Sequence, residues 1–221
     1  FRKLFLLSSA VYFITFAAAF FLLPKGDSRD RSSIKGEKVR VFEKNVMLLF
    51  IACTLMWTSN TMYLIAMPQY VTHILRYSSE LSGFMMGTAA FLEMPVMLVT
   101  GKFARRLGIR TFMILAASGG VLFYVTMLFV TSPFLLLAAQ FFNAVYIGIL
   151  AGIGMVYFQE LLPSVPGEAT TLFSNSAAVG GMAAGVTAGS IAALYGFDYV
   201  FTADLLLAAA AFVMLFFVRK V

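Results

Sequence analysis

The sequence predicts an all-α membrane protein with seven transmembrane helices. Of its 221 residues, 61% are hydrophobic and only 12% are charged, whereas about a quarter of the residues in a soluble domain are charged. The apolar residues form runs of about 20 residues, which is long enough to cross a bilayer. Lys and Arg gather at the ends of these runs, where they face lipid headgroups. This placement assigns the net charge of +6 to the membrane surface and argues against nucleic-acid binding.

The first apolar run covers residues 4–23 and is followed by a charged linker. It is interpreted as a transmembrane helix and not as a secretory signal, because it is long enough to span and has no small-residue cleavage site. Pro24 and Gly26 end it. The linker, residues 25–44, shows no helical period and is expected to be mobile and exposed. Because the chain starts at Phe1, almost directly with an apolar run, it is expected to be part of a longer polypeptide.

The second helix, expected over residues 45–66, carries a polar patch. Trp57, Asn60, Thr61 and Leu64 have the spacing i, i+3, i+4, i+7 and therefore share one face. An aromatic ring beside an amide and a hydroxyl suits a sugar, whose ring faces stack and whose hydroxyls form hydrogen bonds. The same pattern fits a tryptophan packed between helices and an Asn60 that makes one interhelical hydrogen bond. Both interpretations stay open, while the single cysteine, Cys53, is interpreted as a packing residue.

The third helix, expected over residues 81–100, contains an acid inside an apolar run. Glu93 is surrounded in sequence by Met, Ala, Leu, Val and Phe, and an ionised carboxylate is costly in hydrocarbon, which makes reversible protonation feasible. Pro95 removes an intrahelical donor and can bend the helix beside this acid. Glu93 is therefore the candidate for proton coupling. The alternative is a permanently protonated Glu93 that hydrogen-bonds a neighbouring helix.

The remaining helices are expected over residues 109–130, 134–158, 169–194 and 199–218. The helix over 134–158 carries two amides near mid-membrane depth, Gln140 and Asn143. Amides at that depth can hydrogen-bond a polar substrate. Together with Asn60 and Trp57 they are the candidate substrate-binding residues. Asp204, close to the start of the last helix, is expected to be an interfacial or helix-start acid and not a coupling site.

Two glycine series are expected to let helices approach closely. Gly148 and Gly152 form a G-x-x-x-G pair in the helix over 134–158. In the next helix Gly181, Gly185 and Gly189 recur at an interval of four. Such a groove is either a static seam between helices or a surface along which helices slide.

The distribution of basic residues predicts the orientation of the chain. The linker, the segment 102–110 and the C-terminal tail together carry 13 Lys and Arg residues, whereas the opposite side carries 3. Because cytoplasmic loops carry the excess of Lys and Arg, the side with 13 is expected to be cytoplasmic.

The segment GKFARRLGIR resembles the cytoplasmic loop motif of the major facilitator superfamily, G-x-x-x-D-R-x-G-R-[RK]. The matching positions are Gly101, Arg106, Gly108 and Arg110. Arg105 stands where the family has an acid, so the charge pairing attributed to that acid is not carried over to this segment.

Longer segments resemble the second half of the bacterial sugar efflux transporters of that superfamily. They are LFIACTLMWTSNTMYLIAMP, SGFMMGTAAFLEMPVML, FFNAVYIGILAGIGMVYFQELLP and GEATTLFSN, and the match covers most of residues 46–221. The resemblance implies that residues 1–24 are the last helix of an N-terminal half, 25–44 a cytoplasmic central loop and 45–221 a C-terminal six-helix bundle. It also implies a proton-coupled exporter of small sugars, such as galactosides and glucosides, in the bacterial inner membrane. The expected partners are the sugar, protons, the lipid bilayer and the missing N-terminal half, and no cofactor is expected.

Other classes of membrane protein are compatible with parts of this sequence. A seven-helix receptor, a membrane scaffold, or a facilitator for another small solute such as a drug would use the same apolar runs. A channel is less favoured because the sequence has no filter-like segment. An enzyme is not expected, since the sequence shows no nucleophile and base pair, metal-ligand cluster or phosphate-binding loop.

Overall fold

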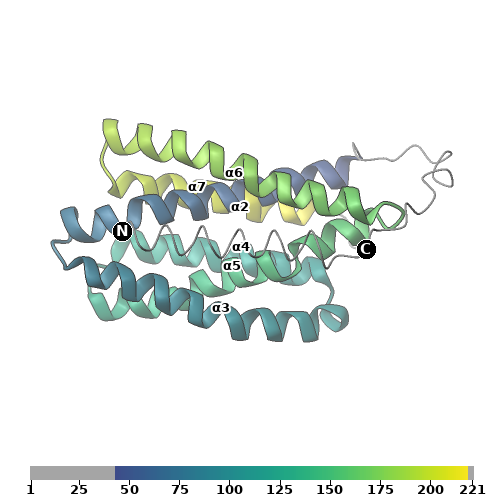
Figure 1. Cartoon of the computed structure of the whole chain (residues 1–221), viewed down its shortest axis with the longest axis horizontal. Helices are drawn as coiled ribbons and strands as arrows, with labels where there is room; N and C mark the ends of the chain where they lie inside the picture. The colour runs from purple at the N-terminus through teal and green to yellow at the C-terminus, as the bar shows by residue number, and fades with distance from the viewer. Residues whose placement is uncertain (1–42, 219–221) are drawn as a thin grey trace, which may run out of the picture. The chain divides into compact units, whose positions relative to one another are not determined.

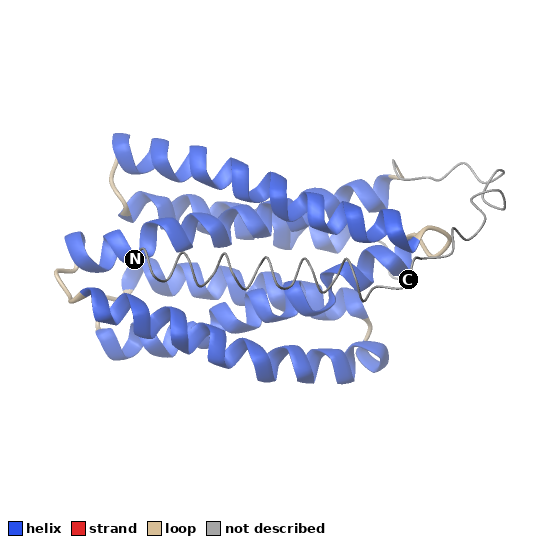
Figure 2. Cartoon of the chain, viewed as in Figure 1, coloured by secondary structure: helices blue, strands red, loops and turns tan. Residues whose placement is uncertain are grey.

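The computed structural model describes residues 43–218, and this range folds as helices joined by short turns (Figure 1; Figure 2). In chain order the elements are α2 (Lys44–Gln69), the π-helix η2 (Tyr70–Ile74), α3 (Ser79–Leu107), α4 (Ile109–Phe129), α5 (Pro133–Leu161), α6 (Pro166–Leu194) and α7 (Asp198–Phe217). Six helices in this range are long and apolar enough to cross a membrane. The all-α membrane prediction is therefore confirmed for six helices. The seventh, expected over residues 4–23, and the linker as far as residue 42 lie outside the described residues.

The six helices pack as two groups that share a central contact. α2 packs along α6 and α7, α5 packs along α3 and α4, and α4 packs against α7. As a result α3 and α6 lie on opposite flanks of this bundle (Figure 1). In an apolar 18-residue stretch of each of these two helices, only 17% is buried inside the bundle. The corresponding share is 50% for α2 and 56% for α5. The interior of the bundle is therefore built mainly by α2, α4, α5 and α7.

The second helix continues beyond its predicted end at residue 66. It passes through Pro68 and extends into η2, so it is longer than the predicted range 45–66. The Thr72 hydroxyl donates to the Pro68 carbonyl oxygen at 2.8 Å. Tyr70 is buried, with its ring centroid 4.9 Å from that of Phe201 in an edge-to-face contact. Packing against α7 favours continuation here, and such breaks are tolerated in membrane helices when backbone groups find other partners.

The basic segment after the third helix is also more helical than predicted. α3 runs to Leu107, so Lys102 and Arg106 lie in its last turns and not in a loop. The break before α4 is a single residue, Gly108, whose φ of 87° is readily adopted only by glycine. The other predicted helices fit better, since α4 to α7 begin and end within three residues of their expected bounds.

The two glycine series have different surroundings. A Cβ atom added at Gly148 would lie 3.1 Å from the Val96 side chain, so this part of α5 fits closely against α3. A Cβ atom added at any of the three glycines Gly181, Gly185 and Gly189 would meet nothing within 4 Å. Among the described residues it is Gly180, one position earlier, that makes the close contact of α6, against the backbone of α2.

Candidate functional site

Polar side chains gather inside the bundle on α2 and α5. Ser59 and Asn60 of α2 and Gln140 and Asn143 of α5 are all buried, with at most 8% of each residue exposed. In a membrane protein, buried polar groups that face the bundle interior mark sites of binding or transport. These four residues, with their neighbours, therefore define the candidate site.

Gln140 is the centre of a hydrogen-bond network that joins α2 to α5. Its Oε1 atom accepts from the Tyr63 hydroxyl at 3.3 Å and from Asn143 Nδ2 at 3.2 Å. Its Nε2 atom donates to the Leu136 carbonyl oxygen at 3.1 Å. The structure thus brings two of the predicted amides, Gln140 and Asn143, into direct contact. Both polar atoms of the Gln140 side chain have protein partners, whereas Asn143 Oδ1 is buried without one in the described range.

The two candidate residues on α2 have different environments. Asn60 is 8% exposed and makes no hydrogen bond within the described range. Trp57 lies in the contact between α2 and α6, with its ring centroid 6.2 Å from that of Phe173. The Trp57 Nε1 atom is buried and has no hydrogen-bond partner. The structure therefore places Trp57 in a helix seam and leaves Asn60 with free hydrogen-bonding capacity.

A second polar group, which the sequence did not single out, involves Tyr146 of α5. Its hydroxyl lies 2.7 Å from Ser59 Oγ and donates to the Met56 carbonyl oxygen at 3.0 Å. The ring fits against Gly120 of α4, where an added Cβ atom would lie 2.8 Å from two ring carbons. The sequence signal that could have indicated this contact is the pair of adjacent glycines, Gly119 and Gly120, which leaves room on α4 for a large side chain from another helix.

Asp204 of α7 lies in a different environment from the one that the sequence predicted. It was expected to be an interfacial or helix-start acid. It is the seventh residue of α7, near the start of that helix, but it is 0% exposed, so the interfacial interpretation is wrong. It lies on the buried face of α7 with Phe201, Ala208 and Ala211. The spacing of these residues is that of one helix face, so the buried position could have been inferred from it.

Glu93 lies apart from the amide network. It is half-buried on α3, which contacts α5 along one side and is otherwise largely exposed. Within the described residues it makes no hydrogen bond or ion pair. Its backbone carbonyl oxygen would be 3.3 Å from a Cβ atom at Gly148, which places it at the α3–α5 contact. The structure therefore does not bring the candidate coupling acid next to the candidate substrate-binding amides.

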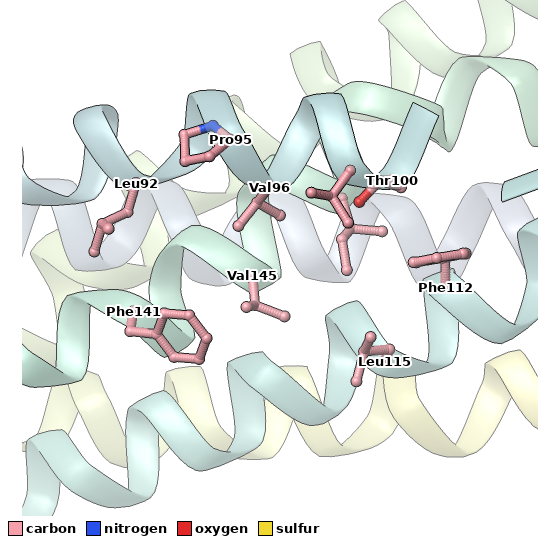
Figure 3. A pocket seen from close by; sticks show the side chains of 10 residues that line it. Leu92, Pro95, Val96, Thr100, Phe112, Leu115, Phe141 and Val145 are labelled. Atoms are coloured by element: carbon pink, nitrogen blue, oxygen red, sulfur yellow. The ribbon is translucent and has the colours of Figure 1, made fainter. Parts of the chain in front are cut away.

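An apolar groove of about 280 Å³ lies between α3, α4 and α5 (Figure 3). Nine of its ten lining residues are apolar, and they include Leu92, Val96, Phe112 and Phe141. Thr100 is the single polar member. A polar ligand would find almost no hydrogen-bond partner there, so this groove does not serve as a sugar site.

The motif positions in GKFARRLGIR gather at one end of the bundle. Gly101 and Arg106 are exposed on the last turns of α3, and Gly108 forms the break. Arg110 donates hydrogen bonds to the carbonyl oxygens of Leu215 and Phe216 at the end of α7. The α3–α4 junction and the C-terminal end of α7 therefore lie on the same side of the bundle, as the count of basic residues assumed.

Six apolar helices with polar side chains turned inward define a multi-pass helical membrane protein. A family model described as Major Facilitator Superfamily matches residues 1–164 and, in a second match, residues 49–221. The chain therefore belongs to the Major Facilitator Superfamily.

Characterised relatives refine this assignment. The chain is 41% identical over 222 residues to sugar efflux transporter A of Dickeya chrysanthemi, covering 100% of the chain and 56% of the relative. It is 41% identical over 226 residues to sugar efflux transporter A of Escherichia coli strain K12, with the same coverage. Identity to sugar efflux transporter B of Salmonella typhimurium is 44% over 197 residues, covering 88% of the chain and 50% of the relative. These similarities confirm the predicted resemblance. The chain spans about half the length of the curated relatives it matches, and no solved structure matches it.

Proposed function

We propose that this chain forms half of a secondary transporter that exports small sugars, such as galactosides and glucosides, in exchange for protons. The observation that carries the proposal is its 41–44% identity to relatives named sugar efflux transporters, over 88–100% of the chain. The bacterial inner membrane is the proposed location. The side that carries Lys102, Arg106 and Arg110 is proposed to be cytoplasmic, because positive residues are retained there.

The exposed faces of α3 and α6 support a transporter made of two halves. Large apolar side chains on these helices have no partner in the described range, among them Leu98, which is 76% exposed, and Val186, which is 73% exposed. Gly181, Gly185 and Gly189 form an open small-residue face on α6. In the facilitator architecture two halves rock against each other around a midplane site. We propose that the other half packs on these faces, and that the bundle alone does not transport.

Substrate contacts are proposed to come from the amides with free capacity. Asn60 has no hydrogen-bond partner in the described range, and the Oδ1 atom of Asn143 has none either. Gln140 is proposed to orient Asn143, since it accepts a hydrogen bond from it at 3.2 Å. Trp57 is proposed to border the site from the α2–α6 seam, where its indole N–H is buried without a hydrogen-bond partner in the described range.

Glu93 is proposed as the proton-coupling residue. Its carboxyl group is half-buried in a membrane helix and has no protein partner in the described range, so it can change its protonation when its surroundings change. Because no hydrogen bond joins Glu93 to the amide network in the described range, coupling is proposed to act through movement of α3 against α5 and not through direct contact with sugar.

The proposal is tested by measuring accumulation of a panel of radiolabelled sugars in everted membrane vesicles that contain the complete transporter, with and without a proton gradient. The expected result is gradient-dependent accumulation of at least one small sugar. Glu93→Gln is expected to abolish the gradient dependence while exchange of sugar for sugar continues. Sugar accumulation that ignores the gradient, or that keeps its pH dependence in Glu93→Gln, overturns the assigned coupling. No accumulation of any sugar overturns the assigned substrate class.

A further inference from the structure

The carboxyl group of Asp204 lies in the interior of the bundle without a partner. The residue is 0% exposed, and neither carboxyl oxygen has a hydrogen-bond partner in the described range. It lies on the same face of α7 as the buried residues Phe201 and Ala208. An ionised carboxylate that is buried in this way without a counter-charge is strongly disfavoured, and such a group takes up a proton instead.

A second unpartnered polar group lies close to Asp204. Tyr124 of α4 is also 0% exposed, and its hydroxyl group, which lies near the Ser59 side chain, makes no hydrogen bond of acceptable geometry in the described range. The Asp204 carboxyl group is near enough to act electrostatically on the hydroxyls of Tyr124 and Tyr146. α4 and α7 pack along each other, which brings these side chains together. No hydrogen bond joins the two groups in the described structure, so the tyrosine hydroxyl does not stabilise a charged carboxylate. A protonated carboxyl group carries no charge and is less costly to bury.

The helices around Asp204 present tyrosines to this site and no cation. Tyr124 comes from α4 and Tyr146 from α5, while Tyr63 of α2 lies next in the same cluster, beside Tyr124. The one carboxylate on α6, Glu168, is exposed in the first turn of that helix. Arg110 of α4 lies at the opposite end of α7, where it bonds the Leu215 and Phe216 carbonyl oxygens. Within the described residues, therefore, no positive side chain compensates an ionised Asp204.

We propose that Asp204 forms a proton-binding site inside the bundle, with its unpartnered carboxyl group protonated at neutral pH. This site is separate from Glu93, which lies on the flanking helix α3. Proton binding at Asp204 does not depend on which solute is carried. Only its use in coupled export rests on the proposed function.

The test is infrared spectroscopy of the purified chain in lipid vesicles at neutral pH, which detects the stretching band of a protonated carboxyl group. The wild-type chain is expected to show this band, and Asp204→Asn is expected to lose it. Tyr124→Phe is expected to keep the band, because no hydrogen bond joins its hydroxyl to the carboxyl group in the described structure. Glu93→Gln is the matched control and is expected to leave the Asp204 band in place.

Heavy-carbon labelling of aspartate carboxyl groups in the unaltered chain provides a reading that needs no substitution, and the band is expected to move to lower frequency. A band that is absent from the wild type, unmoved by the label, or unchanged in Asp204→Asn overturns the proposal. Because the measurement uses neither sugar nor a gradient, its failure is distinct from a failure of the proposed export.

Discussion

Arg110 at the start of α4 hydrogen-bonds the backbone carbonyl oxygen of Phe216 in the last turn of α7, 106 residues further along the chain. A second hydrogen bond runs from Arg110 Nε to the Leu215 carbonyl oxygen at 3.4 Å. The last carbonyl groups of a helix have no partner inside the helix, and they carry partial negative charge. A motif position that marks the superfamily thus also caps the final helix of the bundle.

Arg110→Ala is predicted to destabilise the bundle by about 1–2 kcal/mol, because charged hydrogen bonds to the α7 carbonyl groups are lost. The measurement is the free energy of unfolding of the purified chain in mixed detergent micelles. Arg106→Ala is the matched control, since Arg106 is exposed at the same end of the bundle, and it is expected to change this free energy by less than about 0.5 kcal/mol. Equal losses in the two variants would show that general charge, and not the α7 contact, is responsible.

Replacing Gln140 is predicted to be more costly than removing any one of its partners. Gln140→Leu leaves the Tyr63 hydroxyl and the Asn143 amide buried without the acceptor they share, and each orphaned group costs about 1–3 kcal/mol. Tyr63→Phe removes one donor and leaves Gln140 Oε1 bonded to Asn143, so about 1 kcal/mol is expected. Thermal unfolding of the two variants distinguishes them. A smaller effect for Gln140→Leu than for Tyr63→Phe would contradict the network.

The helix spans could be predicted because runs of about 20 apolar residues have few alternatives in a membrane protein. The end of α3 could not be located in the same way. Lys102 and Arg106 marked the membrane surface correctly, but a helix can continue into the headgroup region, so basic residues do not show where it stops. The predicted end of the second helix at residue 66 was wrong for a related reason, since packing of Tyr70 against Phe201 stabilises the helix beyond Pro68.

Side-chain partners were harder to predict than spans. The amides Gln140 and Asn143 were found because polar residues are rare in an apolar run, but their shared hydrogen bond depends on an i, i+3 contact and on Tyr63 from another helix. Asp204 was judged by its depth alone, although its spacing from Phe201 already placed it on the buried face. Only the packing of α7 on α2 and α4 shows that this acid has no access to solvent.

Two adjacent glycines on α6 provide a matched pair for testing the α2–α6 seam. A Cβ atom at Gly180 would lie 2.9 Å from the Thr54 carbonyl oxygen and 3.0 Å from the Thr58 backbone nitrogen, whereas Gly181 has open space. Gly180→Ala is predicted to lower the free energy of unfolding by about 1–3 kcal/mol, because backbone atoms must move. Gly181→Ala is predicted to be neutral or to raise it by up to about 1 kcal/mol, because alanine favours a helix. Unfolding titrations that rank the two variants in the opposite order would refute the described seam.

The open glycine face of α6 separates folding of the bundle from assembly of the proposed transporter. A Cβ atom added at Gly185 would meet nothing within 4 Å, so Gly185→Leu places its side chain on an open face. The free energy of unfolding of the chain itself is therefore predicted to stay within about 0.5 kcal/mol of the wild-type value. In the complete transporter the same change is predicted to reduce sugar export at least tenfold, because small residues are needed where helices of two halves approach closely. The two measurements are unfolding of the purified chain and sugar accumulation in everted vesicles. Met182→Leu, an exposed position on the same helix that keeps a large apolar side chain, is the control and should retain export. Full export by Gly185→Leu would mean that the partner half does not pack on this face, because a docked helix could not accommodate the added side chain.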